Sequence, residues 1–219
     1  METERYADAV ARWPRNGRHI LAQHDDESLL VYQAFNPDIA RSAVADQRLG
    51  GGGFSFGRMS WVKPNFLWMM YRSGWATKES QERILALRLP RRRFEALLGI
   101  AVASSHGASH LTDVDQWRIE LAASEVRLQW DPDHAPDGSP CERRAVQIGL
   151  RGDTLREFAH EWITEVIDVT PFVESQRALV ASPALLVPVE YVLVLPVAIA
   201  MRAGAAANPA EDRRWREGR

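Results

Sequence analysis

The sequence predicts an α+β fold: a single compact domain with a mixed or mostly antiparallel sheet and flanking helices. Segments in which apolar and polar residues alternate occur as neighbours along the chain, which is typical of antiparallel strands joined by turns. Segments with apolar residues at helical spacing lie between them. The chain has 219 residues, of which 46% are hydrophobic, and a chain of this length buries roughly 70% of its unfolded surface. These patterns favour strands and helices mixed around one core.

The N-terminal part is predicted to hold two helices and a hairpin. Met1–Trp13 is expected to form a short helix that ends before a proline. The apolar runs Arg18–Gln23 and Leu29–Phe35 flank a polar turn, so we expect them to pair as a hairpin. Asn36, followed by proline, marks the start of a second helix that runs to about Arg48, because asparagine caps the first amides and proline favours the first helical position.

The middle of the chain is predicted to alternate between extended and helical segments. Phe54–Val62 is expected to be extended, and Asn65–Arg72 to form a helix that stops at Gly74. Arg83–Leu89 alternates like a strand. Arg92–Ser104 has apolar residues at helical spacing, so a helix is expected there.

Two further strands and two helices are predicted in the C-terminal half. Glu125–Trp130 and Ala145–Leu150 both alternate, and we expect them to pair as a hairpin with a long loop. Thr154–Ile167 carries an apolar stripe typical of an amphipathic helix, and Phe172–Val180 is expected to be helical as well.

The end of the chain is predicted to pack on the domain without entering a membrane. Ala184–Met201 is the most apolar stretch, but two prolines and Glu190 interrupt it. A spanning helix needs about 20 apolar residues without a buried carboxylate, so we expect short extended pieces and a last helix. We assign residues 1–201 to the globular domain and 202–219, rich in alanine, arginine and glutamate, to a flexible C-terminal tail.

Composition excludes several classes of protein. Cys141 is the single cysteine, which excludes an intramolecular disulfide and a zinc ribbon and fits a reducing compartment. The N-terminus lacks an apolar export signal, so we expect a cytoplasmic protein. The net charge of −2 excludes a globally basic nucleic-acid binder, although not a local basic patch. The sequence does not indicate an oligomeric state.

The segment between Asp46 and Glu79 is the candidate functional region, because it contains no acidic residue but concentrates cations and aromatic rings. Arginine and lysine pair with phosphates, and aromatic faces stack on bases, so the mixture suits a nucleotide. The alternative is a packed helix with a solvated basic face. The cations are Arg48, Arg58, Lys63, Arg72 and Lys78, and the aromatic residues include Trp61, Trp68, Tyr71 and Trp75.

Lysine is rare in this chain, which contains 25 arginines and only Lys63 and Lys78 as lysines. Both fall within the candidate region, which suggests a place that needs a compact ammonium group; a chance coincidence is the alternative. The glycine run 50–53 in the same region permits a close approach to a phosphate, but it lacks the spacing of a known phosphate-binding loop.

No metal is expected from the sequence. His106 and His110 have the i, i+4 spacing of metal ligands on a helix, but no third ligand is evident. The aspartates that follow Trp130 lack the twelfth-position glutamate of a calcium loop. Gln147 and Arg151 flank a predicted strand end, where functional polar groups are common. The alternative, that they are ordinary polar residues facing the surface, is equally open.

The sequence resembles the family called domain of unknown function 4291 over about Arg18–Met201. The blocks that carry the resemblance are Val31–Ala34, Arg58–Trp75, Gln129–Asp133, Arg143–Arg151 and Asp168–Val173. The resemblance implies a small bacterial or fungal protein of one domain. It implies no activity, so no catalytic residue is carried over from it.

Our leading hypothesis is a nucleotide-handling enzyme that resembles an ADP-ribosyltransferase and uses NAD. It rests on a fold-level analogy: an early strand, a segment bearing arginine and tyrosine, and a late strand that ends in a polar group. Arg58 and Lys63 are expected to hold the diphosphate, with Arg72 and Lys78 as further cofactor-binding cations. Trp61 or Tyr71 is expected to stack on a ring, and Tyr71 and Gln147 are the candidate catalytic residues, Gln147 orienting a ribose or the acceptor. Such an enzyme usually uses a glutamate where Gln147 stands, and Glu190 is a possible substitute.

Two alternatives remain open. A non-catalytic module for single-stranded nucleic acid or for a protein partner uses the same cations and aromatic rings. A structural protein is favoured if Trp61, Trp68 and Trp75 are all buried and each candidate cation pairs with a carboxylate.

Overall fold

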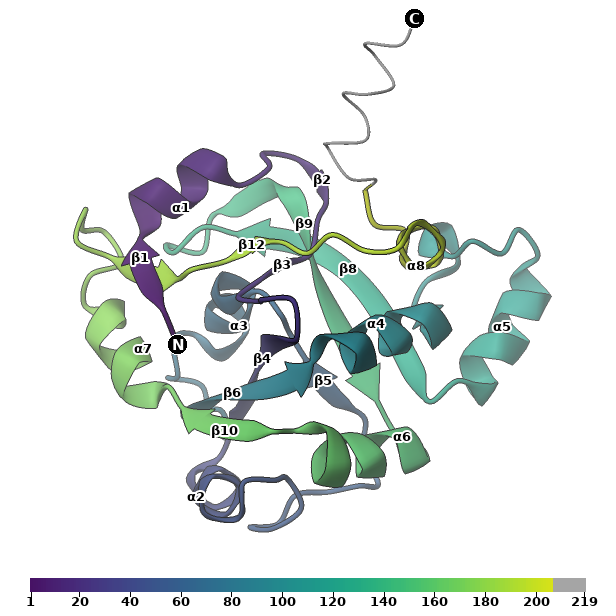
Figure 1. Ribbon diagram of the computed structural model, residues 1–219, viewed down its shortest axis with the longest axis horizontal. Coiled ribbons are helices and arrows are strands. Elements are labelled where there is room, and N and C mark those ends of the chain that lie inside the picture. The colour runs from purple at the N-terminus through teal and green to yellow at the C-terminus, as the bar shows by residue number, and fades with distance from the viewer. Residues whose placement is uncertain (207–219) are drawn as a thin grey trace, which may run out of the picture.

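The computed structural model describes residues 1–206 and consists of two main β-sheets with helices around them (Figure 1). The strands are β1 (Thr3–Arg5), β2 (Gly17–Arg18), β3 (Leu21–Ala22), β4 (Ser28–Phe35), β5 (Ser60–Val62), β6 (Arg83–Pro90), β7 (Val102–Ala103), β8 (Val126–His134), β9 (Pro140–Leu150), β10 (Glu165–Asp168), β11 (Leu186–Pro188) and β12 (Tyr191–Val192). The helices are α1 (Tyr6–Arg12), α2 (Pro37–Asp46), α3 (Phe66–Ser73), α4 (Arg91–Ile100), α5 (Val114–Ala123), α6 (Gly152–Glu157), α7 (Thr170–Arg177) and α8 (Val197–Ala203), with a 3₁₀ turn η1 (His106–Ala108) and a π-helical turn η2 (Phe158–Trp162).

The sheets confirm the predicted α+β class and its mixed strand directions. One sheet has the order β10-β6-β4 with both pairs antiparallel. The other has the order β2-β9-β8-β7, with β5 also paired to β9. In this second sheet β5, β9 and β8 are antiparallel, whereas β2 and β7 add parallel edges.

Within residues 1–206, one isolated backbone bridge joins the two sheets. The amide of Tyr32 on β4 donates to the carbonyl of Lys63 at 2.7 Å, and the amide of Lys63 donates back to Tyr32 at 3.0 Å. Lys63 follows directly on β5, so this bridge brings the edge of each sheet to the same place. We call this junction the seam.

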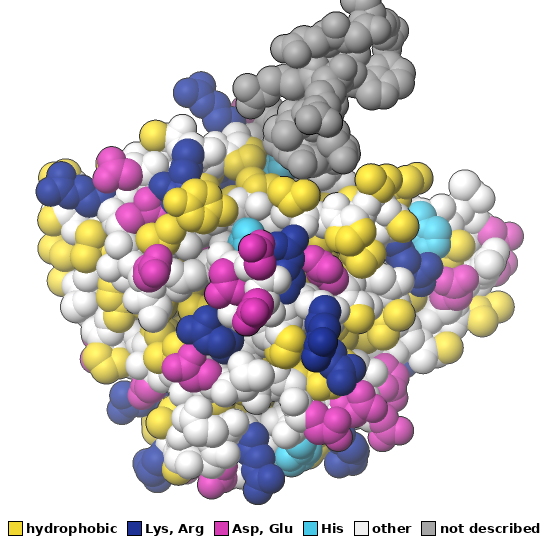
Figure 2. All heavy atoms as spheres, in the orientation of Figure 1, with side chains coloured by type: hydrophobic (Ala, Val, Ile, Leu, Met, Phe, Trp, Pro, Cys, Tyr) yellow, Lys and Arg dark blue, Asp and Glu magenta, His cyan; other side chains and the backbone are white. Residues whose placement is uncertain are grey.

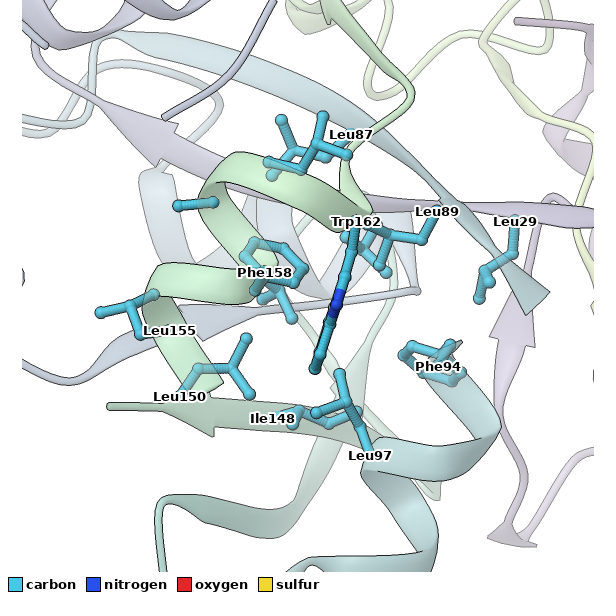
Figure 3. Packing of buried hydrophobic residues seen from close by; sticks show 14 of the residues in the cluster. Leu29, Leu87, Leu89, Phe94, Leu97, Ile148, Leu150, Leu155, Phe158 and Trp162 are labelled. Carbon is cyan, nitrogen blue, oxygen red and sulfur yellow. The ribbon is translucent and has the colours of Figure 1, made fainter. Parts of the chain in front are cut away.

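Two apolar clusters pack on the opposite faces of β4 and β6. The first fills the space between these strands, β8 and β9, and it is closed by α4 and the α6–η2 segment. Figure 3 shows Phe158 and Trp162 among leucines of the sheets and helices and Ile148 of β9. The second cluster covers the other face with residues of α1, α3 and α7. Tyr32 and Phe66 meet edge to face there, with ring centroids 5.5 Å apart. This packing fixes α3 beside the seam.

Helix α3 forms where the sequence predicts it, for local reasons. The side chain of Asn65 accepts a hydrogen bond from the amide of Trp68 at 2.7 Å, which caps the N-terminus. Gly74 ends the helix in the left-handed conformation, with φ of 59°. The cap of α2 by Asn36 is confirmed in the same way.

The predicted N-terminal hairpin is wrong. Leu21–Ala22 pairs with β12 near the C-terminus, and β4 pairs with β6, so the two runs share only an isolated bridge between His24 and Leu29. Leu21 and Ala22 are both buried, one in each apolar cluster. The backbone partner of this buried strand is therefore the distant β12 and not the run that follows the turn.

Several predicted elements are shorter than expected. The helix predicted over Thr154–Ile167 ends in the π-helical turn, and the β-branched residues that follow form β10. Only Ser60–Val62 of the extended segment Phe54–Val62 pairs as a strand. The first predicted helix begins with a strand, β1, that pairs with β11.

The C-terminal stretch forms β11, β12 and α8, as short extended pieces and a last helix were predicted to do. Helix α8 runs through Ala203, two residues past the predicted domain boundary, and the amide of Ala206 donates to the carbonyl of Arg18. The remainder of the predicted tail, residues 207–219, lies outside the described residues. Within residues 1–206, each helix falls short of the length and apolar character needed to cross a bilayer.

Candidate functional site

A cavity of about 420 Å³ opens at the seam. Strand β4, the loop before β5, β5 itself and α3 all contribute to its wall. Four residues that the sequence singles out line it: Arg58, Trp61, Lys63 and Arg72. We call it the Lys63 cavity.

Lys63 is the most unusual group in this cavity, because its side chain is buried in a place with few partners. Its residue is only 6% exposed, and the ammonium donates a long hydrogen bond of 3.3 Å to the carbonyl of Trp61. Burial, together with the positive charge of Arg72, lowers the pKa of Lys63 from its usual 10.5 to about 7, against the opposing effect of Asp131. Lys63 therefore exchanges a proton near neutral pH.

The cations of the cavity are not neutralised by nearby carboxylates. Among residues 1–206, neither Arg58, Lys63 nor Arg72 lies within 4 Å of an acidic oxygen. Arg58 and Arg72 are exposed, so water screens them in the free protein. The structural alternative requires all three tryptophans to be buried and each of these cations to pair with a carboxylate, and the second condition is not met within this range.

The tryptophans of the candidate region differ in burial, and only Trp61 among Trp61, Trp68 and Trp75 lines the cavity. Trp68 and Trp75 are buried and belong to the packing of α3. Trp61 is only partly buried and lines the Lys63 cavity. Its indole lies against the backbone of β9 at Gly149, where an added Cβ would come within 2.9 Å of the ring. Glycine at this position leaves room for the ring and for the sulfur of Met59, which would lie 2.7 Å from the same Cβ.

Gln33 and Ser60 form a polar pair in the wall that sequence analysis did not single out. The Nε2 of Gln33 donates to the Oγ of Ser60 at 2.7 Å. The Oε1 of Gln33 is enclosed and has no hydrogen-bond partner within the described part of the chain. Gln33 lies in the Val31–Ala34 block that carries the family resemblance, and this position in the block was the one sequence signal that could have identified it.

Gln147 does not line the cavity, but it lies on β9 beside Lys63, where it holds a carboxylate. Gln147 and Gln129 stand directly opposite each other on β9 and β8. The Nε2 of Gln147 donates to one oxygen of Asp131 at 2.8 Å, and the Nε2 of Gln129 donates to the other at 2.7 Å. Asp131 lies close enough to Lys63 to favour its charged form, but not within ion-pair distance. We call these three residues the Asp131 cluster.

From the sequence, Asp131 is one of the aspartates that follow the strand predicted to end at Trp130. In the structure, β8 continues through Asp131 to His134, past that predicted end. Asp131 is thus two residues along the same strand from Gln129, on the same face of the sheet. The strand register, which a single sequence does not reveal, brings the cluster together.

Tyr71 and Lys78 lie away from the cavity. The ring of Tyr71 stacks on His134 with centroids 3.4 Å apart, and Tyr71 is 40% exposed. Trp68 lies nearly parallel to both rings. Lys78 donates to the carbonyl of Arg72 at 2.7 Å, so its ammonium caps the C-terminus of α3.

The other candidates serve the fold. Glu190 is buried and accepts hydrogen bonds from Asn65 and from the amide of Phe66, so it anchors the N-terminus of α3. Burial raises the pKa of Glu190 to about 8. In the glycine run, Gly51 and Gly52 pack against α2 with no room for a Cβ. Within residues 1–206, no three histidine, cysteine or acidic residues converge as metal ligands.

A larger hollow of about 610 Å³ lies elsewhere, over β6 and the start of α4, but its chemistry is less specific. It is lined by both acidic and basic residues, and Figure 2 shows the two signs intermixed over β6, β10 and α4. Arg88 in its wall pairs with Glu165 at 2.7 Å. The Lys63 cavity, with unpaired cations beside an aromatic ring, is therefore the stronger candidate.

Comparison with known families agrees with the resemblance of the sequence blocks. The model of the family described as domain of unknown function (DUF4291) matches residues 19–192. The chain belongs to the DUF4291 family. The match includes β4, β5, α3, β8 and β9, so the whole Lys63 cavity and the Asp131 cluster fall within the family domain. No curated protein shows a significant match.

Proposed function

We propose that this protein binds a nucleotide in the Lys63 cavity and acts on NAD as an ADP-ribosyltransferase-like enzyme. The observation that carries the proposal is the group of three cations around the cavity, which lack carboxylate partners among residues 1–206. Guanidinium groups bind phosphate oxygens through paired, charge-assisted hydrogen bonds. Arg58 and Arg72 are suited to a diphosphate, and the exposed part of Trp61 to a planar ring.

The strand arrangement supports the transferase form of the proposal. The analogy needs an early strand, a segment with arginine and tyrosine, and a late strand with a polar group. Strand β4, the β5–α3 segment and β9 supply these, and the seam and the β5–β9 pairing bring them together. This remains an analogy between folds. The chemistry depends on the residues of the cavity.

Because Lys63 titrates near pH 7, the affinity for NAD is expected to depend on pH. An anionic phosphate beside Lys63 favours its ammonium form, so binding raises the pKa of Lys63 and takes up a proton above pH 7. Affinity for NAD is then highest below pH 7. It falls by up to tenfold per pH unit above pH 7, until the pKa of the bound form is reached.

Tryptophan fluorescence with NAD as titrant tests the proposal, because Trp61 lines the cavity. NAD is expected to quench the tryptophan fluorescence saturably. ATP is the competing nucleotide in the same titration. Arg58→Ala is expected to weaken binding by ten- to a hundredfold, the usual worth of hydrogen bonds to a charged group. Arg118→Ala, on exposed α5 and paired with Asp115, is the matched control and is expected to bind normally. Equal affinity of the Arg58 variant and the control would refute the assignment.

A second candidate function is a non-catalytic module for single-stranded nucleic acid, and the exposed ring of Tyr71 favours it. Tyr71 is 40% exposed although His134 stacks on its ring, and the exposed part of the ring is suited to contact with a base. Binding of an oligonucleotide, in contrast to NAD, is expected to weaken steeply with salt, with a slope set by the number of phosphate contacts. The same titration with an oligonucleotide at low and high salt therefore separates the two functions.

A further inference from the structure

Asp131 is a carboxylate whose two oxygens are both held but whose charge is not paired. Each oxygen accepts one amide hydrogen bond, from Gln129 at 2.7 Å and from Gln147 at 2.8 Å. Amide groups carry no net charge, so they orient the carboxylate without neutralising it. Within residues 1–206, no cation comes within ion-pair distance of Asp131.

The Asp131 cluster adjoins the Lys63 cavity. Val62 on β5 pairs with Ile148 on β9, so the next residue, Lys63, lies beside Gln147. Lys63 lines the cavity, and the negative charge of Asp131 favours the ammonium form of its side chain. The junction therefore presents unpaired cations at the cavity and one fixed anion at its border, a layout that matches a ligand with an anionic diphosphate and a cationic ring.

We infer that Asp131 is the catalytic carboxylate of the proposed NAD chemistry, and that Gln129 and Gln147 are the positioning residues that aim it. The inference rests on the proposed function. It also differs from the expectation that Gln147 itself, or Glu190, takes the place of a glutamate. Gln147 is neutral and its amide is engaged with Asp131, whereas Glu190 is enclosed at the N-terminus of α3.

The reaction with water as the acceptor shows what the carboxylate does. The bond between C1′ of the ribose and the nicotinamide nitrogen breaks, and its electron pair leaves with nicotinamide. The ribose then carries the positive charge as an oxocarbenium ion. A fixed negative charge beside it stabilises this state without reorganisation. The oxygen of water bonds to C1′, one proton passes to the solvent, and the products are ADP-ribose and nicotinamide.

Hydrolysis of NAD by the full chain tests the inference, because it needs no knowledge of the natural acceptor. Asp131→Asn keeps the size of the side chain but removes its charge. Turnover is expected to fall at least a hundredfold, in line with the loss of one preorganised electrostatic group, while the affinity for NAD changes by no more than about threefold. Asp137→Asn, on the exposed turn after β8, is the matched control and is expected to retain full turnover.

A second measurement follows the contact between Asp131 and Lys63 directly. The chain contains two lysines, so NMR of protein labelled at the lysine ε-carbon gives two signals. Because Asp131 favours the charged form of Lys63, Asp131→Asn is expected to move the titration of the Lys63 signal to lower pH. Lys63→Arg identifies the signal. Gln147→Leu, which removes one orienting donor, is expected to lower turnover by less than Asp131→Asn does and to leave KM unchanged.

The outcomes separate the two proposals. If the wild-type chain does not bind NAD, the proposed function and this inference both fail. If it binds NAD but does not hydrolyse it, the role of Asp131 and the enzymatic part of the proposed function fail, while nucleotide binding stands. If Asp131→Asn hydrolyses NAD at the wild-type rate, only the role of Asp131 is overturned. An unchanged titration of Lys63 in Asp131→Asn overturns the placement of the carboxylate beside the cavity.

Discussion

Replacing Lys63 by methionine removes an ammonium group from the seam while keeping a long, flexible side chain of similar volume. The group is 6% exposed, and burial lowers its pKa from 10.5 to about 7. A difference of this size between the unfolded and folded pKa values corresponds to about 5 kcal/mol at 1.36 kcal/mol per pH unit. The folded protein therefore bears a large cost for keeping Lys63 where it is.

The sign of the pH dependence follows from the proton count. Between pH 7 and 10.5 the unfolded chain holds a proton on Lys63 that the folded protein has released, so unfolding takes up a proton. The Lys63 contribution to folded stability therefore rises by about 1.4 kcal/mol per pH unit across this window. Below pH 7 both states are protonated and the full cost persists.

Lys63→Met is therefore expected to be more stable than the wild type at pH 7, by about 3 kcal/mol after allowing about 1 kcal/mol for the lost hydrogen bond to Trp61. The advantage is expected to shrink with pH and to vanish near pH 10. Urea unfolding of both proteins at pH 7, 8.5 and 10 measures it. Lys78→Met, at the exposed end of α3, is the control and is expected to be slightly destabilised by loss of its carbonyl contacts. A methionine variant less stable than the wild type at pH 7, or an advantage independent of pH, would refute the reasoning.

Two further substitutions test other parts of the structure. Gly149→Ala places a Cβ within 2.9 Å of the Trp61 ring, so it is expected to cost about 1–3 kcal/mol in thermal unfolding and to weaken NAD quenching by displacing the indole; an unchanged Tm would contradict the close approach. Asp133→Asn breaks the buried pair with Arg143, whose guanidinium also donates to the carbonyl of Pro14, and it is expected to cost about 3–5 kcal/mol. A loss below 1 kcal/mol in urea unfolding would show that this pair does not hold the N-terminal segment.

Elements whose signals are local were predictable from the sequence. Asn65 and Gly74 fix both ends of α3 within ten residues. The strand predicted over Arg83–Leu89 forms as β6, although its residues 84–87 are all buried, on both faces of the sheet, instead of alternating. Strand partners are a different matter, because they depend on which distant segment covers a buried edge. The polar turn after Gln23 looks like a hairpin turn and forms one bridge. The strands on either side, β3 and β4, pair with β12 and β6 instead of with each other.

The candidate site was predictable where it is contiguous in sequence. Arg58, Trp61, Lys63 and Arg72 come from one segment and do line one cavity. Tyr71 belongs to the same segment, but successive residues of a helix point about 100° apart. Arg72 on α3 therefore faces the cavity while Tyr71 faces His134.

The Asp131 cluster shows the limit of a single sequence. Gln147 was identified from its position near a strand end. Its partner Asp131 becomes visible only when the register of β8 against β9 is known. That register depends on the pairing of two whole strands, which alternation alone does not specify.

The seam has a consequence for how the molecule moves. One pair of backbone hydrogen bonds, between Tyr32 and Lys63, links the edges of the two sheets beside the Gln33–Ser60 side-chain bond, and proline at position 63 would remove the amide donor of this pair. The cavity is lined by residues from both sides of this link, so a ligand bound there is expected to hold the two sheet edges together. Binding is then expected to slow local opening at the junction, and amide hydrogen exchange at Tyr32 and Lys63 measures that opening.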